Sequence, residues 1–175
     1  ERLRVAGALR SKAEGKVRYA ADAPIFIALP FDQPVAAEMV SLARAAAKET
    51  GRQFLIKPHP MTPFDFANAA GIAATERKLQ DNDAVSGVIF AATTVGLEAV
   101  LLGLPAFRFQ PAGRVSIDIL PAGMDVPVID RRNFRDVLAS PRPGKVYEKE
   151  PYLAPVNMDL WSIFENGSDA ICHQT

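Results

Sequence analysis

The sequence contains few of the residues that build metal centres and disulfides. Cys172 is its one cysteine, and His59 and His173 are its two histidines. A single cysteine forms no internal disulfide, so we expect a reducing compartment, namely the cytoplasm. The spacing of a zinc site is absent, and so are the Walker loop, the GxGxxG loop and the GxSxG elbow. We therefore expect no metal and no cofactor, and the catalytic residues stay unknown.

An excess of charge and a long apolar run are missing as well. Lysine plus arginine number 20, aspartate plus glutamate also number 20, and the formal net charge is zero. Nucleic-acid binders are normally basic overall, so no nucleic acid is expected as a partner. The apolar runs fall far below the roughly 18–20 residues that cross a bilayer, which predicts no transmembrane segment.

The chain does have a regular alternation of short apolar runs and segments of helical periodicity. Strands joined through helices imply βαβ units. We predict an α/β fold, a Rossmann-like and mainly parallel sheet with helices on both faces. The predicted strands are 25–29, 52–56, 85–90, 105–109 and 125–129, and the predicted helices are 33–50, 62–70, 94–103 and 132–138.

Three parts of the chain differ in composition. Residues 1–21 are basic and are interpreted as an N-terminal helix and linker. Residues 22–140 are predicted to form the Rossmann-like domain. Residues 141–175 are predicted to be an arm rich in proline, followed by a short C-terminal helix around Trp161.

The first candidate motif follows the strand predicted at 52–56. Lys57 and His59 alternate with Pro58 and Pro60, so extended backbone directs both polar side chains to one face. The prolines restrict the backbone and hold these side chains in place. A histidine donor beside a lysine charge suits a phosphate. A solvated loop with a stray histidine is the competing interpretation.

The second motif follows the strand predicted at 85–90. Thr93 and Thr94 precede a helix, and one threonine is enough to cap it. The second hydroxyl and the free amides of the first turn are suited to an anion, and Gly96 allows close approach to the backbone. Glu98 shares a helix face with Thr94 and has apolar neighbours, so it is expected to face solvent, a partner or the ribose of a nucleotide.

Together these segments resemble a known group of enzymes. Lys57-Pro58-His59-Pro60, Thr93-Thr94-Val95-Gly96-Leu97-Glu98-Ala99 and Gly103-Leu104-Pro105 are similar to the C-terminal, donor-binding half of GT-B glycosyltransferases. The closest likeness is to bacterial capsule and surface-polysaccharide transferases of the sialyltransferase and Kdo-transferase kind, and more loosely to CDP-glycerol polymerases. The resemblance covers about residues 24–110.

The resemblance implies a function and also a missing part. It implies that His59, Thr93, Thr94 and Glu98 bind a CMP-, CDP- or UDP-linked sugar, in the cytoplasm or at the inner face of the membrane. In the sialyltransferase-like groups the base comes from an N-terminal domain, and no Asp/Glu-Gly motif stands upstream here. Catalysis would then need a missing N-terminal domain or an oligomeric partner. A UDP-sugar epimerase-like domain and a non-catalytic interaction module remain as alternatives.

Overall fold

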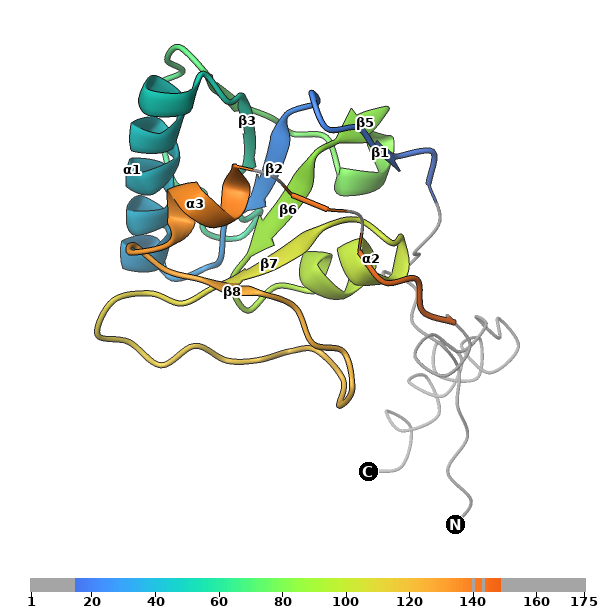
Figure 1. Cartoon of the computed structure of the whole chain (residues 1–175). Coiled ribbons are helices and arrows are strands. Elements are labelled where there is room, and N and C mark those ends of the chain that lie inside the picture. The colour runs from blue at the N-terminus through green and yellow to red at the C-terminus, as the bar shows by residue number, and fades with distance from the viewer. Residues whose placement is uncertain (1–14, 140, 143, 149–175) are drawn as a thin grey trace, which may run out of the picture. The chain divides into compact units, whose positions relative to one another are not determined.

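A computed structural model describes residues 15–139, 141–142 and 144–148 (Figure 1). The described residues up to Tyr147 belong to one compact unit. The predicted C-terminal helix and most of the predicted N-terminal helix and linker lie outside the described residues.

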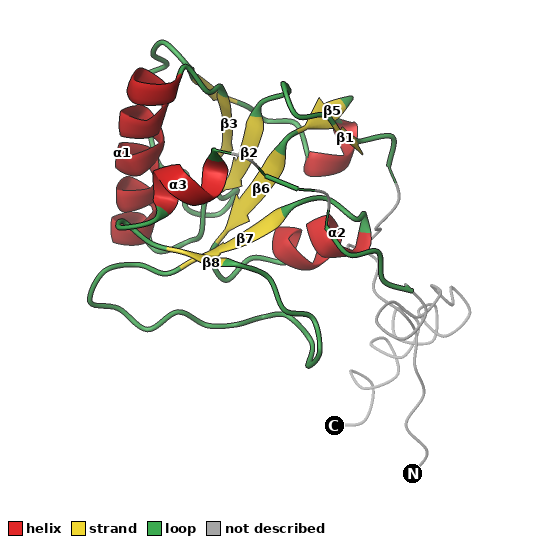
Figure 2. Cartoon of the chain, viewed as in Figure 1, coloured by secondary structure: helices red, strands yellow, loops and turns green. Residues whose placement is uncertain are grey.

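A parallel six-stranded sheet forms the centre of this unit, which confirms the predicted α/β class (Figure 2). The strand order is β4-β3-β2-β6-β7-β8, and every neighbouring pair is parallel. Numbered within this sheet alone, that is the 3-2-1-4-5-6 order of dinucleotide-binding folds. The strands are β2 (Ile25–Ala28), β3 (Phe54–Lys57), β4 (Ile72–Ala74), β6 (Gly87–Phe90), β7 (Ala106–Phe109) and β8 (Val128–Ile129).

Helices cover both faces of the sheet (Figure 1). On one face α1 (Gln33–Thr50) and α3 (Phe134–Leu138) join a core with alternate strand residues such as Ile27 and Ile89. On the other face α2 (Val95–Leu101) and the short 3₁₀ helix η1 (Leu79–Asp81) accompany the remaining strand residues, which include the fully buried Phe90. Both faces of the central strands β2 and β6 are buried, which explains their continuous apolar sequences.

The ends of α1 agree with the sequence prediction. The Asp32 side chain accepts a hydrogen bond from the Val35 amide (3.2 Å), as an N-cap does. Gly51 ends the helix with φ +71°, and its amide donates to the Ala47 carbonyl. Glycine suits this left-handed position because it has no Cβ atom.

The helix predicted at 62–70 is wrong. This segment contains only isolated bridges and irregular backbone. Its polar groups bond to distant elements instead: Gln33 Nε2 donates to the Thr62 carbonyl (2.9 Å), and Arg44 donates to the Ala67 carbonyl (2.9 Å). Contacts with α1 therefore replace the local hydrogen bonds that a helix would need.

Several other boundaries differ from the prediction. The strand predicted at 85–90 is interrupted at Ser86, because β5 (Ala84–Val85) pairs with β1 (Arg18–Tyr19) in a separate parallel pair. Strand β4 was not predicted. Residues 125–127 precede β8 without forming strand, and α3 begins two residues later than predicted.

The connection between β7 and β8, residues 110–127, is the longest irregular segment between two strands in the described part of the chain. Near its start, Arg114 forms an ion pair with Asp32 (3.1 Å), and the Ala112 amide donates to Glu38 (3.1 Å). The connection thus begins at the carboxyl end of the sheet and returns to the amino end, where β8 starts. None of the helices in the described residues has the length and apolar character needed to cross a membrane.

Candidate functional site

The two candidate motifs lie at the same edge of the sheet. Ala28 of β2 pairs with Lys57 of β3 on one side and with Phe90 of β6 on the other. All three strands are parallel, so their carboxyl ends form one edge, which we call the carboxyl edge. The sequence predicts that the tips of the strands before the two motifs lie side by side at one edge of a parallel sheet, and the shared edge is confirmed. The two strand tips are not side by side, however, because β2 lies between them and separates them by about 10 Å.

Lys57 is half-buried on the sheet face opposite α1. Its Nζ atom donates to the Glu76 carbonyl (2.6 Å), which uses one of the three ammonium donors. The side chain is therefore held against the connection that follows β4. Its positive charge has no carboxylate partner among the described residues.

His59 is held in a turn that fixes the role of its ring nitrogens. The Met61 amide donates to His59 Nδ1 (3.3 Å), and the Thr62 hydroxyl lies 3.4 Å from the same nitrogen. Because Nδ1 accepts, the neutral ring carries its proton on Nε2. The Phe31 ring stands edge-on to the imidazole, with 6.4 Å between centroids. His59 is half-exposed and has a hydrogen-bond donor on Nε2.

The turn between β6 and α2 has an unusual backbone and an unsatisfied hydroxyl. Ala92 has φ +49°, a left-handed conformation that costs a residue with a Cβ atom about 1–2 kcal/mol. The next residue, Thr93, buries its Oγ1 without a hydrogen-bond partner. Buried hydroxyls are normally satisfied, so this atom has an unmet requirement for a partner.

Thr94 occupies the N-cap position of α2, as predicted, but its hydroxyl makes no capping bond. One of the two threonines was expected to cap the helix, but neither side chain makes a capping hydrogen bond. Helix α2 has only seven residues. This short length limits the helix dipole at the N-terminus of α2.

Gly96 has a packing role. A Cβ atom at this position would lie 2.3 Å from Cε2 of Phe90. The absence of a side chain is therefore required by the ring of β6 beneath the helix. This packing contact is enough to explain why residue 96 is a glycine, and no ligand is needed for the explanation.

Glu98 has a partner within the fold. Its Oε2 accepts a hydrogen bond from Gln80 Nε2 (2.7 Å), which joins α2 to η1. Burial raises the pKa of the carboxyl, while the Gln80 bond and the charge of Lys78 act in the opposite direction. Of the three surroundings expected for Glu98, the structure contains the protein partner.

The carboxyl edge also contains residues that the sequence analysis did not select. Phe31 (60% exposed) and Met61 (84% exposed) flank His59, while Val115 and Ile117 are exposed on the 110–127 connection. Sequence reasoning assigns such apolar residues to the core. For Phe31 alone the sequence indicated exposure, because this residue follows the strand predicted at 25–29 and residues just after a strand face the loops.

None of the six candidate residues lines the two cavities described next. A cavity of about 390 Å³ lies at the amino ends of β7 and β8, and a second of about 190 Å³ lies between α1 and α3. Within the described residues, no group of three or more His, Cys, Asp or Glu side chains is arranged to hold a metal ion.

Comparison with known proteins does not assign the chain to a family. No protein-family model matches the sequence, and a search of curated proteins returns no match. The function therefore has to be inferred from the geometry of the site.

Proposed function

We propose that the carboxyl edge binds the nucleotide of a sugar donor, and that the chain is the donor-binding domain of a GT-B-type glycosyltransferase in bacterial surface-polysaccharide biosynthesis. One observation carries the proposal: the His59 and Thr93 motifs flank β2 at the same edge. Helix α1 follows β2 on one face and α2 follows β6 on the other, so the crossovers change face between these strands. Open α/β sheets bind ligands at such a switch point.

In this proposal the phosphate is recognised by neutral and charged donors together. His59 donates from Nε2, and the Met61 amide keeps that tautomer in place. Lys57 supplies charge with the donors that the Glu76 carbonyl does not use. A phosphate oxygen would also give the buried Thr93 hydroxyl the partner that it lacks. Hydrogen bonds to charged groups are about twice as strong as neutral ones.

The ribose is the proposed ligand of Glu98. One carboxylate oxygen accepts from Gln80, so the remaining acceptor capacity is available to sugar hydroxyls. Gln80 then acts as the residue that orients the carboxylate.

Catalysis requires a further domain or chain in this proposal. The candidate residues other than Gly96 bind phosphate and ribose, and none of them acts as a base for the acceptor. Exposed apolar side chains gathered around a binding edge are typical of a surface that another domain covers. Phe31, Met61, Val115 and Ile117 are such side chains.

Calorimetric titration of the full chain with CMP, CDP and UDP tests the proposal. We expect micromolar to millimolar affinity and a rise in melting temperature, because the ligand binds only the folded state. His59→Ala should weaken binding about tenfold, the lower range for losing a hydrogen bond to a charged group. Lys48→Ala, which removes an exposed charge from the last turn of α1, is the control and should bind as the parent does. The absence of heat and of thermal shift with every pyrimidine nucleotide at several millimolar would refute the proposal.

A further inference from the structure

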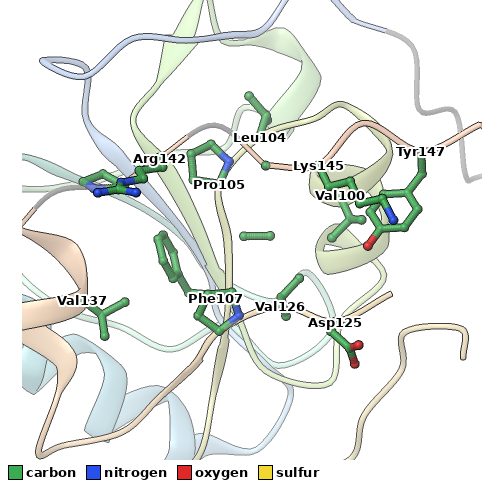
Figure 3. Close-up of a pocket in the computed structure, with 14 residues that line it drawn as sticks. Val100, Leu104, Pro105, Phe107, Asp125, Val126, Val137, Arg142, Lys145 and Tyr147 are labelled. Carbon is green, nitrogen blue, oxygen red and sulfur yellow. The ribbon is translucent and has the colours of Figure 1, made fainter. Parts of the chain in front are cut away.

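The cavity of about 390 Å³ at the amino end of the sheet is separate from the carboxyl edge (Figure 3). The cavity forms because β8 is shorter than β7, which lies beside it. Arg108 and Phe109 pair with β8, whereas Ala106 and Phe107 have no β8 partner. The chain before β8 and the described residues 141–142 and 144–147, which we call segment 141–147, surround this gap. Its volume falls in the range of small-molecule sites.

The lining of the cavity is apolar and poor in backbone donors. The apolar side chains come from α2 and the turn after it, from β7, from the chain before β8 and from α3: Val100, Leu104, Phe107, Val126 and Val137. Pro105, Pro127 and Pro141 also line it, and a proline has no N–H group. A polar group on a ligand would therefore have to be met mainly by side chains.

Charged side chains stand at the rim of the cavity. Figure 3 shows Arg142 and Lys145 on one side of it and Asp125 on the opposite side. Arg142 has no hydrogen bond or ion pair with another described residue. Lys145 lies over the Tyr147 ring, 4.9 Å from its centroid, which orients the ammonium group without neutralising it. The rim therefore carries a local excess of positive charge.

Hydrogen bonds hold segment 141–147 in the position that closes the cavity. The Tyr19 hydroxyl donates to the Pro141 carbonyl (2.8 Å), and the Gly144 amide donates to the Gly103 carbonyl (3.1 Å). A Cβ atom on Gly144 would lie 2.6 Å from the Leu104 carbonyl oxygen, so the two segments are in direct contact. The wall that carries both cations is thus already formed without a ligand.

We propose that this cavity binds a small organic anion with an aromatic or branched apolar body. The apolar body occupies the space between Phe107, Val126 and Val137, and the anionic group faces Arg142 and Lys145. The site does not depend on the proposed nucleotide site, which uses none of these residues.

The first experiment compares two probes on the full chain by ligand-observed NMR and calorimetry. 4-Phenylbutyrate has the proposed chemistry, and 4-phenyl-1-butanol has the same apolar body without the charge. We expect the carboxylate to bind about fivefold more tightly, which is a modest gain because both cations are exposed. Equal affinity for the two probes, or no binding of either at several millimolar, would overturn the proposal.

Variants then locate the binding. Arg142→Gln with Lys145→Gln should reduce 4-phenylbutyrate affinity to that of the alcohol, whereas Arg131→Gln, which removes an exposed arginine elsewhere, should leave it unchanged. Val126→Phe should fill the cavity and abolish binding of both probes, with thermal melting as the check on folding. Val137→Phe fills it from the opposite wall and replaces the first variant if that one unfolds. Binding that survives a folded filling variant would contradict the proposed site.

Discussion

The two ends of the parallel sheet differ in what they offer a ligand. The carboxyl edge has His59, Lys57 and an unsatisfied Thr93 hydroxyl, but these residues line neither described cavity. The amino end has a cavity of about 390 Å³ whose lining is mostly apolar. Polar chemistry and concave shape are therefore separated in this domain. A second domain over the carboxyl edge would supply the missing wall there, whereas the amino end already has its own.

The largest expected effect comes from Gly96→Ala at the carboxyl edge. The new Cβ would overlap the Phe90 ring, which is fully buried and has no space to move into. We expect the free energy of unfolding to fall by about 2–3 kcal/mol, in the range for overpacked cores. Chemical denaturation measures this loss.

The double variant Gly96→Ala with Phe90→Leu is the control for that substitution. If the ring is the cause, the double variant should be more stable than the sum of the two single effects predicts. Additive losses would instead mean that the Phe90 ring is not the cause of the instability of Gly96→Ala.

Gly144→Ala, at the amino end of the sheet, should lower the free energy of unfolding by less than Gly96→Ala does. Its Cβ would meet the Leu104 carbonyl oxygen, but segment 141–147 lies outside the sheet and can shift at the loss of the Gly144–Gly103 hydrogen bond. We expect about 1 kcal/mol, the net value of one hydrogen bond. Binding of 4-phenylbutyrate should nevertheless weaken strongly, since the wall with both cations moves. A loss as large as that of Gly96→Ala would show that this segment is part of the core.

The smallest effect on stability is expected from Glu98→Gln, and it depends on pH. Burial raises the folded-state pKa of Glu98 above its ordinary value of 4.5, so the folded state holds the proton more tightly than the unfolded state. The resulting stabilisation is present below pH 4.5 and is lost as pH rises through the folded-state pKa. The variant should therefore gain stability relative to the parent between pH 4.5 and 7. Melting curves across this range measure the difference.

Nucleotide titration of the same variant separates fold from site. If Glu98 accepts from ribose hydroxyls, binding should weaken by about 1–3 kcal/mol even though the unliganded domain is no less stable. A variant that is less stable at pH 7 would indicate that the charge interaction with Lys78 outweighs burial.

The features that the sequence predicts correctly are those set by local patterns. Strands β2 and β6 are buried on both faces, so their composition identifies them, and Asp32 with Gly51 marks the limits of α1. The positions of Lys57 and Thr93 at one edge follow from parallel strands alone. Local patterns of this kind are visible in a single sequence.

Features that depend on distant contacts could not be predicted. Segment 62–70 begins with Thr62 and Pro63, which is typical of a helix start, but it bonds to α1 instead. Strand β4 has three residues and exists because β3 lies beside it. The cavity results from the short length of β8 and the path of segment 141–147. No local spacing encodes the difference between two strand lengths.

The central pairing of the sheet has a consequence for the order of folding. Ile25 lies beside Gly87, and the chain between them contains α1, β3 and β4. Contacts between residues so far apart in sequence close large loops and form slowly. The carboxyl edge needs β2, β3 and β6 together, so no nascent chain that ends before Phe90 contains it. Refolding kinetics should therefore report the formation of the carboxyl edge as a late event, after α1 has formed.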